Sequence, residues 1–139
     1  MSLFGLDDQL DASAVLPIIQ KWAKVTRLRD LRIGQQVLDD RVPSILLAIN
    51  KPTFLTIDQG FWSRRWCNPN YCVLYFALRS DQQARLPDLL RKLMRLPEFQ
   101  TRSRRNGKVA RVGLESVEYW QWQVADPQRI PWKAGPKSN

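Results

Sequence analysis

The stretch YCVLYFAL, residues 71–78, carries an apolar side chain at every position. A strand with one solvent-facing side alternates apolar and polar residues, whereas a strand covered on both faces reads as a continuous apolar run. This stretch is therefore predicted to be a strand in the middle of a mostly parallel sheet, with helices packed above and below it.

The segments around this stretch alternate between the patterns of strands and helices. Three segments have apolar residues at helical spacing and are predicted helices: 12–23, 40–50 and 86–94. The other apolar segments are short and are predicted strands: 3–6, 23–28, 53–57, 108–114 and 116–122. Such alternation predicts an α/β fold with a mostly parallel central sheet flanked by helices.

The length of 139 residues suits one domain, which we place at residues 1–123. Residues 124–139 are rich in proline and polar side chains and are expected to form an extended C-terminal tail. No run approaches the roughly 18 apolar residues of a membrane helix. The N-terminus lacks the basic and apolar segments of a signal peptide. We therefore expect a cytoplasmic protein without a membrane partner.

The chain contains no histidine and two cysteines. The missing histidine excludes a Ser-His-Asp triad, a Cys-His pair and a histidine general base. Cys67 and Cys72 lack the further ligands that a zinc site requires. They are interpreted as reduced thiols, with a local disulfide as the alternative. Proton transfer in an enzyme of this sequence would need carboxylates, lysines or a metal-bound water.

The formal net charge of +9 is unevenly distributed along the chain. Residues 1–60 hold seven basic and seven acidic side chains, whereas residues 61–139 hold fifteen basic and six acidic ones. A basic half favours a polyanion as partner, with nucleic acid as the first candidate. The alternative is a solvated surface that only keeps the protein soluble.

Aspartates lie at the boundaries of the predicted elements, after the first and third strands and before the second helix. They are Asp7, Asp8, Asp39, Asp40 and Asp58. Ligands of parallel sheets bind beyond the carboxyl ends of the strands. Carboxylates that converge there are costly unless a cation is bound, and oxygen ligands suit Mg²⁺ or Mn²⁺. Alternatively, each aspartate is an ordinary N-cap or turn residue.

Three motifs in this order, LDDQL (6–10), an acid at position 40 and FLTIDQGF (54–61), resemble the short PIN-like nuclease domains. That family has a first strand that ends in Asp-Glu, a mid-chain aspartate that opens a helix, and a strand that ends in Thr-x-Asp-x-Asp-Phe. Thr56 and Asp58 match the last motif, as does Phe61.

The spacing also resembles that of the family, because Asp40 lies eighteen residues before Asp58. The sequence departs from the family at three positions. Gly60 stands in place of the second acid of the last motif, Leu47 in place of an alanine, and Asp8 in place of a glutamate.

The resemblance covers residues 3–122 and implies a PIN-like three-layer fold with the activity of a Mg²⁺- or Mn²⁺-dependent ribonuclease, often the toxin of a toxin–antitoxin pair. It implies catalytic and metal-binding roles for Asp7, Asp40 and Asp58, with Asp8 as a further ligand. Asp39 and Thr56 would support the site. Expected partners are RNA, an antitoxin and a second copy of the chain. The alternatives are a non-catalytic RNA- or antitoxin-binding module with a degraded metal site, and an unrelated α/β interaction protein.

Two basic motifs are candidates for contact with RNA. Arg64 and Arg65 closely follow Asp58, and the flanking Trp62 and Trp66 could stack on bases. Alternatively, both tryptophans belong to the core or to a dimer contact. A second run, TRSRRNGK (101–108), is expected to form a loop that binds RNA or is simply solvated. Its candidate residues are Arg102, Arg104, Arg105 and Lys108.

Overall fold

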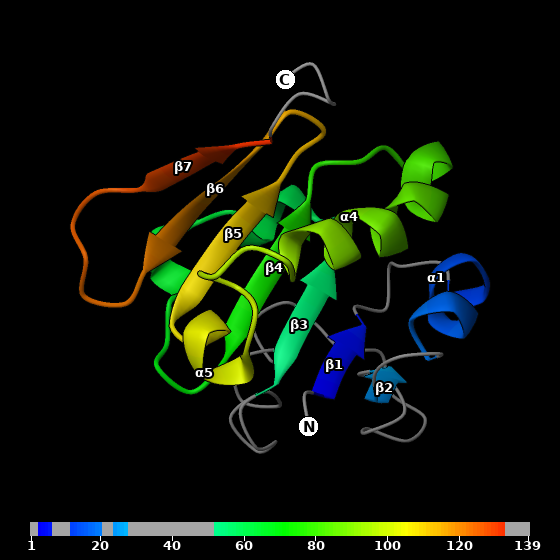
Figure 1. The fold of residues 1–139 in the computed structure, drawn as a ribbon, viewed down its shortest axis with the longest axis horizontal. Coiled ribbons are helices and arrows are strands. Elements are labelled where there is room, and N and C mark those ends of the chain that lie inside the picture. The colour runs from blue at the N-terminus through cyan, green and yellow to red at the C-terminus, as the bar shows by residue number, and fades with distance from the viewer. Residues whose placement is uncertain (1–2, 7–11, 21–23, 28–51, 133–139) are drawn as a thin grey trace.

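The computed structural model describes residues 3–6, 12–20, 24–27 and 52–132. In this part of the chain, seven strands form one sheet (Figure 1). The strands are β1 (Leu3–Leu6), β2 (Lys24–Arg27), β3 (Thr53–Thr56), β4 (Cys72–Phe76), β5 (Lys108–Val112), β6 (Ser116–Gln121) and β7 (Gln128–Pro131). The helices are α1 (Ala12–Ile19), α4 (Leu86–Leu93) and α5 (Arg102–Arg105), with 3-10 helices η2 (Gln59–Phe61), η3 (Arg64–Trp66) and η4 (Ser80–Arg85).

The strands follow the order β2-β1-β3-β4-β5-β6-β7 across the sheet. The first five in this order pair in parallel, whereas β6 is antiparallel to both β5 and β7. The direction of β6 follows from its connection, because only residues 113–115 separate β5 from β6. A parallel neighbour would need a crossover of a dozen or more residues.

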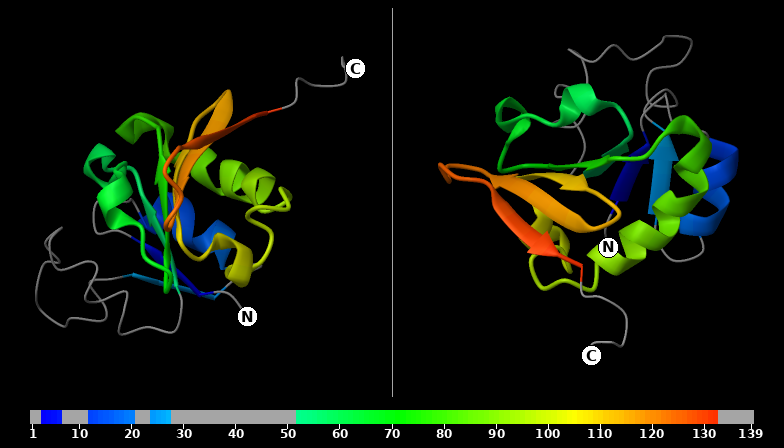
Figure 2. Two further views of the ribbon diagram at one scale, coloured as in Figure 1. Left: turned by 90° about the vertical axis from the view of Figure 1, so that its left-hand side faces the viewer. Right: turned by 90° about the horizontal axis from the view of Figure 1, so that it is seen from above.

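The expected fold class, a mostly parallel central sheet flanked by helices in a PIN-like three-layer arrangement, is wrong. The sheet is mixed, because β6 and β7 close it as an antiparallel unit. The described α-helices have only 8, 8 and 4 residues. They lie together on one face of the sheet, while η2 and η3 lie on the other (Figure 2).

Several individual elements agree with the sequence-based predictions. Strands lie within each of the predicted strand segments, and α4 buries the predicted leucine face. The predicted helix at 40–50 lies outside the described residues. Residues 128–131 of the expected tail form β7 and pair with β6, so this part of the tail belongs to the sheet. No helix among the described residues is long and apolar enough to cross a membrane.

Two apolar clusters cover the two faces of the sheet. On the helix-bearing face, Leu74 of β4 packs in a cluster with Leu55 of β3 and Leu90 of α4. On the opposite face, Val73 joins a largely aromatic cluster that includes Phe54. All five residues of β4 are buried. The prediction that this strand is covered on both faces is therefore confirmed, although one cover consists of 3-10 turns rather than helices.

Candidate nucleic-acid interface

Asp58 lies just beyond β3, at the carboxyl end of that strand. Its backbone N–H donates a hydrogen bond to Oγ1 of the buried Thr56 over 2.9 Å. Its own Oδ1 accepts from the N–H of Gly60 at 2.9 Å, which makes Asp58 the N-cap of η2. The capping role that was the alternative interpretation of this aspartate is therefore present in the structure, and Thr56 orients the backbone that carries it.

The other acids of the predicted metal site, Asp7, Asp8, Asp39 and Asp40, lie outside the described residues. In the part of the chain that the structure describes, no group of three or more cysteine and acidic side chains could hold a metal ion. Asp58 with its described surroundings therefore does not by itself fit Mg²⁺ or Mn²⁺. The convergence of Asp7, Asp40 and Asp58 on one site stays a prediction.

An aromatic cluster holds η2 and η3 against the sheet. The ring of Phe61 lies 5.2 Å from that of Phe54 in β3 and 5.0 Å from that of Trp66 in η3. Trp66 is 8% exposed, and its Nε1 donates to the carbonyl oxygen of Gly60 at 3.0 Å. Trp66 is therefore a core residue, as the alternative interpretation proposed, and does not offer a platform for bases.

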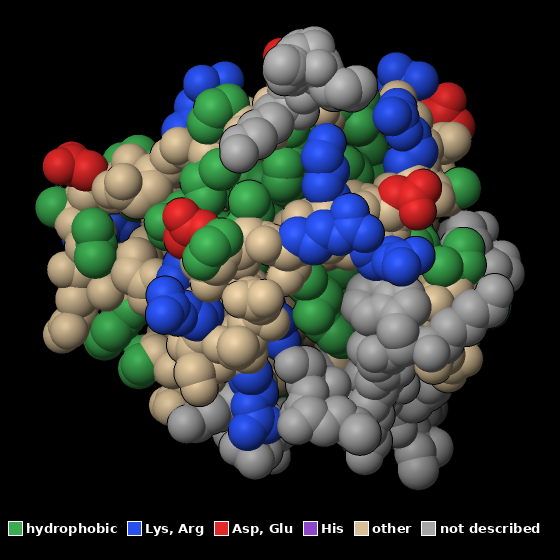
Figure 3. All heavy atoms as spheres, viewed as in Figure 1, with side chains coloured by type: hydrophobic (Ala, Val, Ile, Leu, Met, Phe, Trp, Pro, Cys, Tyr) green, Lys and Arg blue, Asp and Glu red, His purple; other side chains and the backbone are tan. Residues whose placement is uncertain are grey.

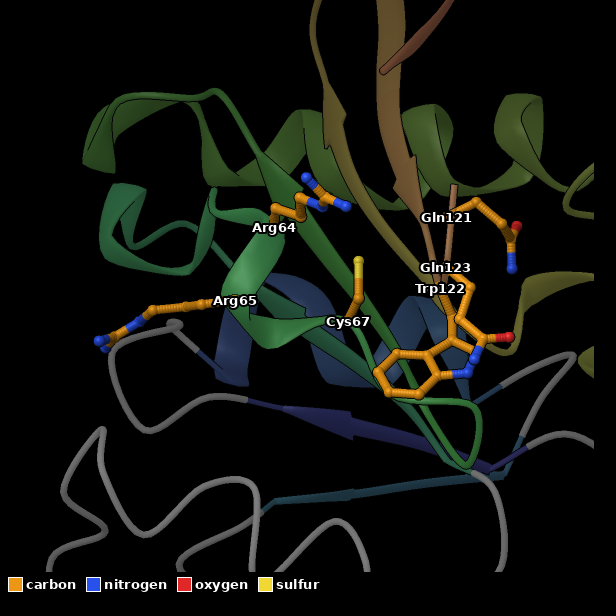
Figure 4. Close-up of a pocket in the computed structure, with 6 residues that line it drawn as sticks. All are labelled: Arg64, Arg65, Cys67, Gln121, Trp122 and Gln123. Atoms are coloured by element: carbon orange, nitrogen blue, oxygen red, sulfur yellow. The ribbon is translucent and has the colours of Figure 1, made fainter. Parts of the chain in front are cut away.

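Two exposed arginines extend from η3 over aromatic rings. The guanidinium carbon of Arg64 lies 5.9 Å from the ring centre of Trp120 in β6. That of Arg65 lies 4.4 Å from the ring centre of Trp66. Half-buried Trp62 packs beside Trp120, with ring centres 6.4 Å apart. The rings thus position both cations at the surface, where the two side chains extend in different directions (Figure 4).

An open pocket of about 430 Å³ lies between η3 and the end of β6. The indole of Trp122 in this pocket is 42% exposed. Gln121 and Gln123 add side-chain amides to the lining, so the pocket combines cationic, aromatic and amide groups. Its lining residues are Arg64, Arg65, Cys67, Gln121, Trp122 and Gln123 (Figure 4).

Gly107, which precedes β5, permits the close approach of the end of β6. Its φ of +87° lies in the region that favours glycine. A Cβ at this position would lie 2.6 Å from Nε2 of Gln121, and the Gly107 carbonyl accepts from the N–H of Trp122 at 2.7 Å. The glycine therefore fixes where Trp122 leaves the sheet and enters the pocket.

Both cysteines are unpaired thiols, as predicted. Burial raises the pKa of the Cys67 thiol, and the nearby charge of Arg64 offsets only part of that rise. Burial raises the pKa of Cys72 to about 12. Because the thiolate is the reactive form, neither cysteine is activated as a nucleophile at neutral pH.

The second basic run forms the short helix α5, capped by Thr101, rather than the expected loop. Arg105 is 0% exposed, and its Nη1 donates to the carbonyl oxygen of Phe99 at 2.9 Å. This burial excludes the direct RNA contact that was expected of Arg105. Lys108 is 9% exposed and donates from Nζ to the carbonyl oxygen of Arg104 at 2.6 Å, so its ammonium group is also engaged inside the domain.

The remaining members of this run differ in exposure. Arg104 is exposed and Arg102 is half-buried. Neither lines the pocket at η3. Of the predicted RNA-binding residues, the structure thus brings only Arg64 and Arg65 together at this pocket.

The sequence-based predictions missed the pocket residues contributed by the end of β6. Gln121 and Trp122 were assigned only to a closing strand, and Gln123 only to the last position of the domain. The alternation in SVEYWQW (116–122) was an available signal, because it places positions 118, 120 and 122 on one face of a strand.

Comparison of the chain with protein-family models, with curated proteins and with solved structures finds no match in any of the three. The described part of the chain is a mixed-sheet domain with a cationic, aromatic pocket beside its 3-10 turns. A PIN-like ancestry and a nuclease activity stay predictions from the sequence motifs.

Proposed function

We propose that this protein binds single-stranded RNA through the pocket between η3 and β6. The observation that carries the proposal is a pocket whose lining combines the exposed indole of Trp122 with two exposed arginines, Arg64 and Arg65. Guanidinium groups form charge-assisted hydrogen bonds with phosphates. Aromatic rings stack on bases with little dependence on sequence.

The pocket suits an unpaired nucleotide better than a duplex. Stacking on an indole requires a base that is not already stacked in a helix. A volume of about 430 Å³ lies within the range of small-ligand sites and accommodates a group of the size of a nucleotide. The side-chain amide of Gln123 offers donors and an acceptor for a base edge, whereas Nε2 of Gln121 already donates to the carbonyl oxygen of Asn106 at 3.4 Å.

The test compares Arg64→Ala/Arg65→Ala with wild type in binding to a fluorescent oligouridylate over a range of salt concentrations. We expect weaker binding at low salt and a salt slope smaller by ~0.7 for each phosphate that the variant no longer neutralises. Trp122→Ala should weaken binding by about 1–3 kcal/mol without the change in slope, because stacking releases no counterions.

The matched control is Arg91→Ala, which removes an exposed arginine of α4 on the other face of the sheet. Figure 3 shows that lysine and arginine side chains are also abundant on that face, beside acidic ones. If charge alone attracts the RNA, Arg91→Ala will reduce the slope as much as a single substitution at η3. That result would contradict the proposed site. Competition by an acidic protein would instead indicate an antitoxin-like partner.

A second candidate function is metal-dependent cleavage of RNA, as the PIN-like resemblance implies. One observation favours it: β1 and β3 are parallel neighbours, and Leu6 at the end of β1 pairs with Leu55. The carboxyl ends of both strands therefore lie at the same edge of the sheet, where Asp58 follows β3. The described residues supply only Asp58 of the predicted ligand set at this edge.

The test of this candidate is Asp58→Asn, assayed for RNA cleavage with Mg²⁺, with Mn²⁺ and with a chelator. If Asp58 is a metal ligand, cleavage should require the metal and fall about tenfold or more in the variant. Asparagine can still cap η2, so the melting temperature should hold. If cleavage persists with chelator, or if wild type cleaves no RNA with any metal, metal-dependent cleavage is rejected and RNA binding remains as the proposed function.

A further inference from the structure

A row of polar side chains crosses five strands near the carboxyl ends of β3, β4 and β5. Residues that are register partners on neighbouring strands lie side by side on one face of a sheet. Each member of this row is the register partner of the next. In order across the sheet they are Thr56, Tyr75, Arg111, Glu118 and Arg129.

The row lies on the same face as η2 and η3. Side chains two positions apart along a strand share a face. On the parallel strands β3, β4 and β5, the residues two positions before the row are Phe54, Val73 and Val109 of the aromatic cluster. On the antiparallel β6, Trp120 lies two positions after Glu118 and packs against the same cluster. This face therefore changes from apolar to polar toward the carboxyl ends of the parallel strands, where sheets of this kind bind ligands.

The charges of the row remain accessible. Nη1 of Arg111 lies 3.5 Å from Oε1 of Glu118, and the two side chains are 38% and 39% exposed. Arg129 is exposed and is the partner of Glu118 on β7. Glu118 thus lies between Arg111 and Arg129 in the strand register and forms an ion pair with Arg111. The three side chains carry a net charge of one positive unit.

The strand β6 connects this row to the pocket. Glu118 and Trp120 share one face, and Trp122 lies just beyond the strand in the pocket. From position 118 to position 122 the distance is ~13 Å at ~3.3 Å per residue. Each stacked nucleotide of a single strand advances by ~3.4 Å. A strand of several nucleotides therefore spans this distance and can contact the row and the pocket at the same time.

We infer that Arg111 and Arg129 form a second phosphate-binding subsite, which extends the proposed RNA interface along β6. The inference rests on the proposed function of the pocket. Glu118 regulates the subsite, because its carboxylate pairs with the guanidinium group of Arg111 until a phosphate displaces it. A partly exposed ion pair is weak, so a phosphate can compete for Arg111 successfully.

The decisive variant is Glu118→Gln, which removes the competing charge and preserves the shape of the side chain. We expect it to tighten the binding of the oligouridylate by roughly two- to fivefold. Arg111→Ala and Arg129→Ala should each weaken binding and reduce the salt slope by ~0.7. Arg91→Ala on the opposite face is the control, and thermal melts check that each variant is folded.

A second probe, inorganic pyrophosphate, separates this inference from the proposed function. It has no base and needs no stacking on Trp122, so we expect it to perturb the NMR signals of the Arg111 and Arg129 side chains. If pyrophosphate perturbs these signals but the protein does not bind oligouridylate, the phosphate subsite is supported and the RNA-binding function is rejected. The subsite would be overturned if RNA binding responds to Arg64→Ala/Arg65→Ala but not to substitutions in the row. In that case Glu118→Gln, Arg111→Ala and Arg129→Ala would all bind RNA like the control.

Discussion

Replacing Arg105 with alanine is expected to lower the free energy of unfolding by about 3 kcal/mol or more. The side chain is completely buried, and its Nε donates to Oγ1 of Thr53 at 3.1 Å. Nη1 donates to the carbonyl oxygens of Phe99 and Gln100. Removing the guanidinium takes charge-assisted hydrogen bonds from the buried acceptors on Thr53 and Phe99. It also leaves a cavity against Phe4, whose ring lies 5.4 Å away.

The control for this prediction is the neighbouring Arg104→Ala in the same helix α5. Arg104 is exposed, so its loss should change the free energy of unfolding by no more than about 0.5 kcal/mol. Urea denaturation of both variants measures the difference. Equal stabilities would mean that Arg105 does not hold α5 against the sheet. Under conditions in which Arg105→Ala stays folded, its RNA salt slope should match that of wild type, because a buried side chain contacts no phosphate.

Replacing Phe61 with alanine is expected to destabilise the protein by about 3–5 kcal/mol, the usual cost of truncating a buried phenylalanine. Phe61 is 1% exposed and packs edge-on against Phe54 and at a tilt against Trp66. It is the central ring of the cluster that fixes η2 and η3. The substitution should therefore also weaken RNA binding, although Phe61 itself does not line the pocket.

Two further variants make this prediction specific. Phe61→Leu keeps most of the apolar volume and should lose less stability than Phe61→Ala. Leu114→Ala removes a side chain that is 42% exposed and should have little effect on either property. Hydrogen exchange of the η2 and η3 amides measures the local consequence. Unchanged exchange in Phe61→Ala would show that the aromatic cluster does not hold these turns.

The sequence alone determined those features that arise within one short segment. The apolar run at 71–78 indicated a strand buried on both faces, and β4 is that strand. The helical spacing of the leucines at 86–94 indicated α4 and its buried face. The aspartate after the third strand was placed correctly, at the carboxyl end of β3. Periodicity and turn chemistry act over a few residues, so they can be read without knowledge of the rest of the fold.

The direction of the last strands was only partly determined by the sequence. Both closing strands were predicted, but their antiparallel arrangement was not, and the expected fold class failed for this reason. The three-residue connection at 113–115 carried the missing information, because it is too short for a parallel crossover. The remaining error, helices expected on both faces, involved how separate elements pack together.

Only the tertiary structure decided which charged and aromatic side chains are available for binding. Arg105 and Arg104 are close in sequence and alike in chemistry, yet one is buried against Thr53 from 52 positions earlier and the other is exposed. Likewise, Trp66 lies in the core whereas Trp122 lines the pocket. Whether a side chain is buried depends on which distant segments the sheet places against it. A basic or aromatic run has the same local pattern whether its side chains are buried or exposed, so the sequence alone does not distinguish them.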